Sequence, residues 1–311
     1  MTLRHIVLAC ATLALVCLSD GVLRAQSERG TIRGLIVDAT NSAIERVSVT
    51  ATNVDTGVTT ASISDRDGLY SLLNLPPGRY DLAFEKDGFR PLVHAMTVGV
   101  QSALRLDVTL QVGGVRDSVT VNATSPLLDS RSGATGTTLQ NAVITNLPLN
   151  ITSGRSIENF AYAIAPGVEG NNWTSNIVGG APFTKEVILD GTSATIQIQG
   201  HITESSPPME AVQEFKIDTS GMPAEYGRTG GGVFNFSLRS GTNALHGSAY
   251  GQFRHEAFDA NTWMNDYLAS ADPANTDLYA KPRDRQQLGG VSLGGPVREN
   301  KTFYFLSFEE Y

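Results

Sequence analysis

Cysteine is scarce in this sequence, with two among 311 residues, and both stand near the N-terminus. Cys10 and Cys17 lie in an apolar run over 6–18, which is shorter than the ~20 apolar residues of a spanning helix. We expect residues 1–25 to be a secretory signal peptide that is cleaved after Ala25, rather than a single membrane anchor. The exported chain would then hold no cysteine, which excludes disulfides and thiolate metal sites.

Sequence motifs of enzymes are also missing. The five histidines show no metal-ligand spacing, no His-Glu-x-x-His pair occurs, and no Gly-x-Ser-x-Gly elbow is present. Removing 1–25 takes two residues from the 23 basic ones and one from the 31 acidic ones, which leaves a net charge of −9. Without a basic stripe, nucleic acid is not expected as a partner. We therefore expect a protein without catalytic residues, metal or cofactor.

Residues 30–111 alternate between apolar and polar side chains in three places, over 47–51, 80–85 and 104–111. Such a period of two predicts half-buried β-strands. Turn signals separate these stretches at 56–57, 65–68, 76–78 and 86–88. Short strands at this spacing predict an antiparallel β-sandwich over 26–112.

The order of four motifs in this region is more specific. Gly-Thr-Ile-Arg-Gly-Leu-Ile-Val-Asp at 30–38 precedes Asp-Gly-Leu-Tyr at 67–70, Leu-Pro-Pro-Gly-Arg-Tyr at 75–80 and Gly-Phe at 88–89. This succession resembles the carboxypeptidase regulatory-like domain, which implies a transthyretin-like or carbohydrate-binding-like sandwich without peptidase activity. Glycan binding through Tyr70, Tyr80 and Phe84 is an alternative, but their strand positions favour core packing.

A second series of motifs fills the middle of the chain. It comprises Asn-Leu-Pro-Leu-Asn at 146–150, Ala-Pro-Gly-Val at 165–168, Val-Ile-Leu-Asp-Gly at 187–191, Ala-Val-Gln-Glu-Phe-Lys at 211–216, Ala-Glu-Tyr-Gly-Arg at 224–228 and Arg-Ser-Gly-Thr-Asn at 239–243. The series resembles the plug domain of TonB-dependent outer-membrane receptors of the Oar-like group. The resemblance implies an α+β plug domain over 113–244. The loops at 151–153 and 177–180 depart from the family pattern.

Three consecutive glycines, Gly230 to Gly232, suggest a phosphate-binding loop at first sight. A Walker loop needs a lysine after its last glycine, and a dinucleotide loop opens a helix. Here no lysine follows, and 233–238 is strand-like. We expect these glycines to let the backbone turn sharply or approach a neighbouring wall closely, as suits a plug sheet inside a barrel whose last strand passes into the barrel wall.

The segment Asp117, Ser118, Val119, Thr120 and Val121 alternates between polar and apolar residues just before the expected plug. By resemblance it is a TonB box, which pairs as an added strand with a TonB-like periplasmic energy-coupling protein. The alternative is an ordinary linker strand that ends the sandwich.

Residues 245–311 mix aromatic and polar side chains with imperfect alternation. The resemblance implies that they begin an outer-membrane β-barrel, and an ordinary β-domain is the alternative on pattern alone. At 9–11 residues per strand they supply roughly three or four strands, against ~22 in a plugged-lumen barrel. We therefore expect a truncated, N-terminal fragment of a longer protein.

Together these features predict a mainly β chain that is the N-terminal part of a TonB-dependent transporter in the outer membrane. Its extracellular ligand is unknown, and its plug loops would contact that ligand. Asn171, Asn172 and Trp173 are candidates because they could stack a sugar or peptide, although a loop tryptophan also serves local packing. The alternative function is a secreted, soluble binding or adhesion protein whose sandwich recognises a glycan or protein.

Overall fold

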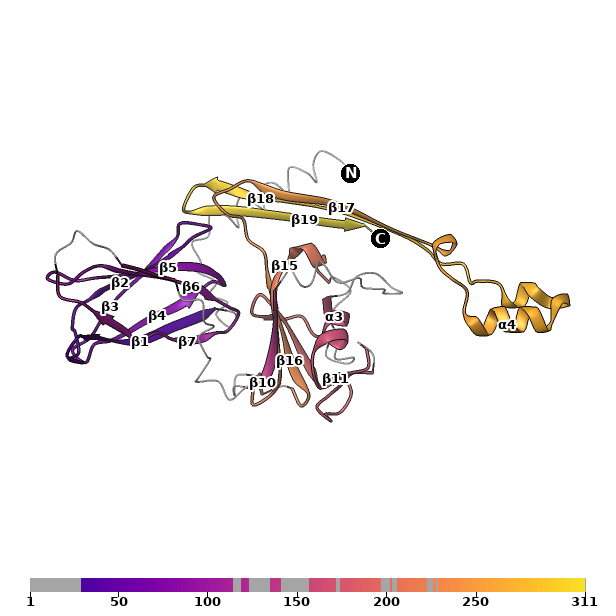
Figure 1. Ribbon diagram of the computed structural model, residues 1–311, viewed down its shortest axis with the longest axis horizontal. Helices are drawn as coiled ribbons and strands as arrows, with labels where there is room; N and C mark the ends of the chain where they lie inside the picture. The colour runs from indigo at the N-terminus through magenta and orange to yellow at the C-terminus, as the bar shows by residue number, and fades with distance from the viewer. Residues whose placement is uncertain are drawn as a thin grey trace, which may run out of the picture.

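In a computed structural model, the structure describes residues 29–113, 119–122, 135–140, 157–171, 174–196, 202, 206–222, 226–227 and 229–310. The described strands form a sandwich, then a mixed sheet accompanied by a helix, and finally an antiparallel meander (Figure 1). The mainly β fold class predicted from the sequence is confirmed. Within the described ranges, no helix is long and apolar enough to cross a membrane.

The sandwich is built from nine strands in two sheets. They are β1 (Gly30–Asp38), β2 (Ser48–Asn53), β3 (Thr59–Ile63), β4 (Leu69–Leu75), β5 (Gly78–Glu85), β6 (Leu92–Val98), β7 (Ala103–Arg105), β8 (Val108–Leu110) and β9 (Val119–Asn122). One sheet has the order β4-β1-β7, with β8 also paired to β1, and the other has the order β3-β2-β5-β6-β9. The faces that these sheets turn toward each other enclose one apolar core.

Aromatic residues predicted for the core are indeed inside it. Tyr70, Tyr80 and Phe84 are buried, and the rings of Tyr70 and Phe84 meet edge to face with centroids 5.5 Å apart. The Tyr70 hydroxyl donates a hydrogen bond to the Leu106 carbonyl at 2.8 Å. Because these rings face the core, they offer no surface on which a glycan could stack.

The continuous strand predicted over 104–111 is wrong, because the structure has two short strands, β7 and β8, that pair in parallel with successive parts of β1. The break falls where the Leu106 carbonyl lies against Gly34, and a Cβ at Gly34 would stand 1.7 Å from that oxygen. The Asp107 carboxylate accepts a hydrogen bond from the Leu35 N–H at 2.9 Å and so satisfies a main-chain donor at the break.

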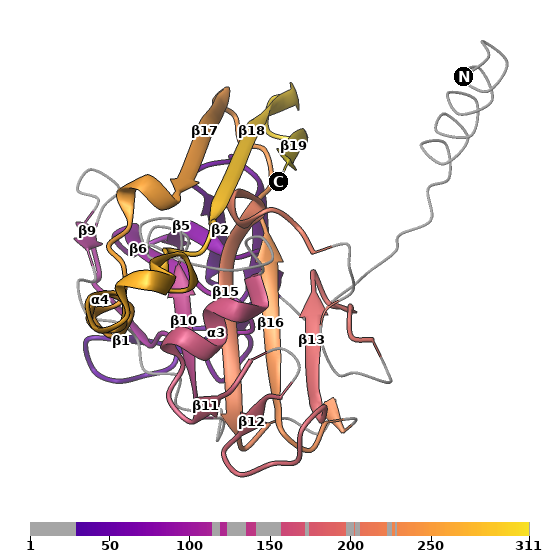
Figure 2. The same cartoon turned by 90° about the vertical axis from the view of Figure 1, so that its right-hand side faces the viewer.

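The second part contains a five-stranded sheet of order β10-β15-β16-β13-β14, with helix α3 over one face (Figure 2). Its elements are β10 (Thr135–Gln140), α3 (Ile157–Ile164), β11 (Val168–Glu169), β12 (Asn176–Ile177), β13 (Lys185–Leu189), β14 (Thr192–Ser193), η1 (Met209–Ala211), β15 (Val212–Ser220) and β16 (Gly232–Leu238). Phe215 and Phe236 pack with ring centroids 5.2 Å apart, and Tyr162 of α3 meets Phe234 at 6.1 Å. The sheet and helix therefore share one core.

The three glycines lead into β16 beside the start of β13. The N–H groups of Gly230 and Gly231 donate to the Thr184 carbonyl at 3.0 and 3.2 Å. A Cβ at Gly231 would stand 2.7 Å from Thr184 Oγ1, so any larger residue at this position would force the Thr184 side chain or the backbone to move. The glycines do approach another backbone closely, at Thr184 directly before β13 of the same sheet. Their approach to a barrel wall stays a prediction.

The third part is the meander of β17 (His246–His255), β18 (Arg285–Arg298) and β19 (Thr302–Glu310). Between β17 and β18 the chain forms η3 (Glu256–Phe258), α4 (Trp263–Ala271) and η4 (Pro273–Tyr279), an arm at the far end from the sandwich (Figure 1). Trp263 and Tyr267 stack on this arm with centroids 5.5 Å apart, and both are exposed.

Candidate functional site

The candidate coupling segment lies at the edge of the sandwich. Strand β9 pairs in parallel with β6 in a register that places Leu92 opposite Val119 and His94 opposite Val121. Val119, Thr120 and Val121 therefore form an added strand, which is the position that the linker-strand alternative expects. Asp117 and Ser118 lie outside the described residues, so the assignment of the whole segment as a TonB box stays a prediction.

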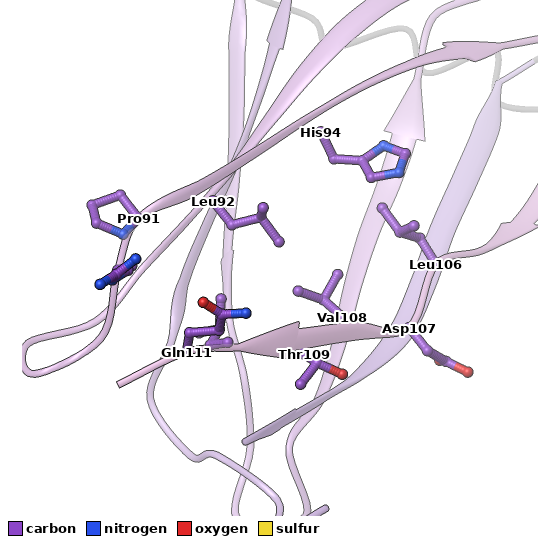
Figure 3. Close-up of a pocket in the computed structure, with 10 residues that line it drawn as sticks. Pro91, Leu92, His94, Leu106, Asp107, Val108, Thr109 and Gln111 are labelled. Carbon is purple, nitrogen blue, oxygen red and sulfur yellow. The ribbon is translucent and has the colours of Figure 1, made fainter. Parts of the chain in front are cut away.

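A pocket of about 350 Å³ opens beside the same edge, between β6 and β8 (Figure 3). Its volume falls within the range of small-molecule sites. Apolar side chains, among them Leu92, Leu106 and Val108, form much of its lining. The complete lining within the described residues is Arg90, Pro91, Leu92, His94 and 106–111.

His94 is the buried polar residue of this pocket, with 8% of its surface exposed. Its Nδ1 has no hydrogen-bond partner among the described residues. Burial lowers the pKa of the His94 imidazole, because the charged form loses its hydration there. A neutral imidazole has one donor nitrogen and one acceptor nitrogen, so His94 adds a buried, directional polar group to a lining that also contains Arg90 and Asp107.

The sandwich also touches the sheet of the second part. The Val100 N–H donates to the Glu214 carboxylate, and the Gln101 side chain donates to the Tyr226 hydroxyl. On another loop, the Asn243 N–H donates to the Asp55 carbonyl at 3.0 Å. A third loop is held by the Gln213 side chain, which donates to the Pro77 carbonyl at 3.4 Å. Hydrogen bonds therefore hold the sandwich at three of its loops.

Glu214 predicts a pH dependence for this contact. Burial raises the pKa of its carboxyl, and the Val100 N–H and Lys216 oppose that rise. An acid with a raised folded pKa stabilises the fold below the unfolded pKa, near 4.5, and this contribution disappears as pH rises through the folded value. We expect Glu214→Gln to gain stability relative to the unsubstituted chain as pH increases from 4 to 8, since the amide keeps an acceptor without a charge.

Urea midpoints followed by circular dichroism across that pH range measure the effect. Glu210→Gln, on the adjoining turn of η1, is the matched control and should run parallel to the unsubstituted chain. A constant offset between Glu214→Gln and the unsubstituted chain at every pH would contradict the expected titration.

A buried ion pair links helix α3 to strand β13. Lys185 Nζ lies 2.6 Å from Glu158 Oε1, and both side chains are fully buried. Lys185 Nζ also contacts Ser175 Oγ at 3.1 Å, and the Tyr162 hydroxyl donates to Glu158 Oε1 at 2.9 Å. The Ile202 N–H donates to the other oxygen, Glu158 Oε2, at 2.8 Å. One carboxylate thereby joins a helix, a strand and the main chain at Ile202.

Sequence reasoning missed this pair, because Glu158 and Lys185 belong to no motif and stand 27 positions apart. The only hint is Lys-Glu directly before Val-Ile-Leu-Asp-Gly, where charged residues open a strand that is otherwise apolar. Burial lowers the pKa of Lys185, and the Glu158 carboxylate opposes that shift by favouring the ammonium.

The predicted ligand residues are placed only in part. Asn171 is exposed, and its side-chain oxygen accepts hydrogen bonds from the Thr174 N–H at 3.0 Å and from Thr174 Oγ1 at 3.2 Å. This is a local turn of the kind that asparagine side chains stabilise. Asn172 and Trp173 lie outside the described residues, so ligand contact by this loop stays a prediction.

Two family models match the chain. Residues 31–111 match the carboxypeptidase regulatory-like domain, and residues 237–311 match an outer membrane beta barrel domain. The chain is 28% identical over 293 residues to the TonB-dependent transporter Oar of Myxococcus xanthus. That alignment covers 91% of this chain and 27% of the relative, so the chain spans about a quarter of the relative's length.

The solved structures that match parts of this chain include two receptors. The siderophore receptor PirA from Acinetobacter baumannii is 18% identical with a TM-score of 0.40, covering 56% of this chain and 24% of the receptor. The ferric enterobactin receptor PfeA from Pseudomonas aeruginosa is 15% identical with a TM-score of 0.39, covering 58% and 24%.

Proposed function

On the premise that this chain is an outer-membrane relative of the TonB-dependent receptors, we propose that it forms the N-terminal part of an energy-coupled transporter. The observation that carries the proposal is the alignment with Oar, which runs through 91% of the chain. The order of a regulatory-like sandwich before a barrel segment supports it. The ligand is an unidentified extracellular molecule.

The proposed division of labour follows the chain. Residues 1–25 direct export, 26–112 form the body of the sandwich, 113–244 supply its added strand β9 and then the plug, and 245–311 begin the barrel. Residues 117–121 bind the coupling protein by strand addition, in which main-chain hydrogen bonds supply the affinity. Plug loops, including Asn171, Asn172 and Trp173, contact the ligand. The protein is a receptor and transporter rather than an enzyme.

Proline substitution tests the coupling segment, because proline removes a main-chain donor from an added strand. We expect Thr120→Pro to reduce binding of the purified chain to an immobilised TonB periplasmic domain from the same organism by at least about tenfold, since 1.4 kcal/mol corresponds to tenfold. Ser132→Pro, in the same connecting segment but outside the box, is the control. Equal binding by Thr120→Pro and the unsubstituted chain would reject residues 117–121 as the box.

The rival function, a secreted soluble binding protein, would leave the chain outside the membrane. Outer-membrane localisation, supported by the barrel-domain match, argues against that rival. The edge pocket is the feature that a binding role of the sandwich would use.

A further inference from the structure

We propose that the sandwich holds the coupling segment in cis at its β6 edge, so that the coupling protein has to compete with this edge for the segment. The inference rests on the proposed function for the identity of the segment. It adds an intramolecular competitor, which would regulate when coupling begins.

The first support is the position of β6 in its sheet. On one side β6 pairs with β5 through seven register partners, from Gly78 opposite Val98 to Phe84 opposite Leu92. On its other side the partner is β9, at the end of the sheet order. Without β9, β6 would present an open row of main-chain donors and acceptors, which is a ready template for another strand. The edge is thus a receptor for an extended segment, and the segment that occupies it is 119–122.

The second support is that one stretch of β6 serves both the pairing and the pocket. Leu92 and His94 are the register partners of Val119 and Val121. The side chains of Leu92 and His94 also line the pocket beside β8 (Figure 3). The main-chain pairing of β6 with β9 therefore runs alongside this pocket. An extended segment docked on this edge lies next to apolar surface as well as main-chain partners.

The third support is mechanical. Gly113, just before the segment, donates its N–H to the Gly88 carbonyl of the sandwich at 3.2 Å, so the chain is tied to the sandwich there as well. While β9 stays paired with β6, a pull by the coupling protein on β9 acts first on the hydrogen bonds between β9 and β6. The force reaches β10, the first strand of the plug sheet, only after these bonds break. The ladder comprises four register pairs, and such short edge segments open far more readily than a whole domain unfolds. Release of β9 would then precede transmission of force to the plug.

A disulfide between β6 and β9 tests this inference in the full chain. Ala95 is opposite Asn122, and neighbouring strands lie about 4.8 Å apart, within the Cα separation that a disulfide spans. With the signal peptide removed, the chain has no other cysteine to interfere. The matched control is Ala95→Cys with Thr120→Cys, two positions out of register and about 8 Å away by strand geometry.

We expect Ala95→Cys/Asn122→Cys to form an intramolecular disulfide on mild oxidation, seen by intact mass and thiol labelling, while the out-of-register pair stays reduced. The oxidised chain should then bind the TonB periplasmic domain at least about tenfold more weakly than the same chain after reduction. The single variants Ala95→Cys and Asn122→Cys should bind equally with and without reductant.

Failure of the in-register disulfide to form would overturn the cis pairing. Equal binding of the oxidised and reduced chains would overturn the competition, because the coupling protein would then add to the outer edge of β9, and the proposed function would stand. Absence of binding in both states, and in the single variants, would instead overturn the assignment of the coupling segment and the competition that depends on it.

Discussion

Lys185→Met is expected to destabilise the five-stranded sheet that contains β13 by about 3–5 kcal/mol, which is the typical loss when one partner of a buried ion pair is removed. Lys185 and Glu158 are fully buried, so the substitution leaves the Glu158 carboxylate uncompensated in the core. The remaining donors, from Tyr162 and Ile202, satisfy its oxygens without neutralising its charge. Hydrogen exchange of amides in β13 and β16, together with urea denaturation, measures the loss.

The double variant Glu158→Gln/Lys185→Met is the matched control. It removes both charges and keeps an acceptor on the helix, so it should recover most of the stability that the single variant loses. A loss below about 1 kcal/mol in Lys185→Met would contradict the buried pair, since that is the scale of an exposed one.

Phe84→Ala is expected to destabilise the sandwich by about 3–5 kcal/mol, because truncation of a buried aromatic leaves a cavity as well as lost apolar burial. Phe84 is fully buried near the end of β5, and its ring meets the Tyr70 ring of the opposite sheet edge to face. Two measurements report the change in stability: the midpoint of urea denaturation and the hydrogen exchange of amides in β2 and β5.

Leu69→Ala is the control for Phe84→Ala, because Leu69 is 51% exposed at the start of β4. Its expected effect lies within about 0.5 kcal/mol, as for most surface substitutions. If the two variants lost similar stability, the sandwich core would not be organised around Phe84.

These two substitutions also separate the parts of the molecule. Phe84 belongs to the core of the sandwich and Lys185 to the five-stranded sheet, and among the described residues the two sit in separate cores. Distant sites of this kind usually have additive effects. We therefore expect Lys185→Met to lower the exchange protection of β13 amides and to leave that of β2 amides unchanged. Phe84→Ala should lower the protection of β2 amides and leave that of β13 amides unchanged.

The sandwich was largely predictable because its signals are local. Alternation places Tyr80, Leu82 and Phe84 on one face of a strand, and turn residues such as Gly57 and Gly68 with positive φ mark the connections. Local signals failed at 104–111, because the interruption between β7 and β8 depends on the contact of Leu106 with Gly34, which is 72 positions away.

The candidate site was predictable only by resemblance. The alternation over 117–121 predicts an extended strand, but a strand's partner is set by whichever edge the fold leaves open. Lys185 and Glu158 carry no motif at all, since an ion pair between a helix and a strand needs no fixed spacing in the chain.

By itself the sequence predicted an export signal and an exported part without cysteine, and it determined most strand and turn positions of the sandwich and the order of motifs that relates the chain to outer-membrane receptors. These follow from residue type and near-neighbour spacing. Only the tertiary structure decided that β9 lies on β6, that His94 is buried beside an apolar pocket, and that Glu158 and Lys185 meet. Each of these is a contact between segments whose separation along the chain carries no signal, because pairing and burial depend on how complete sheets pack together.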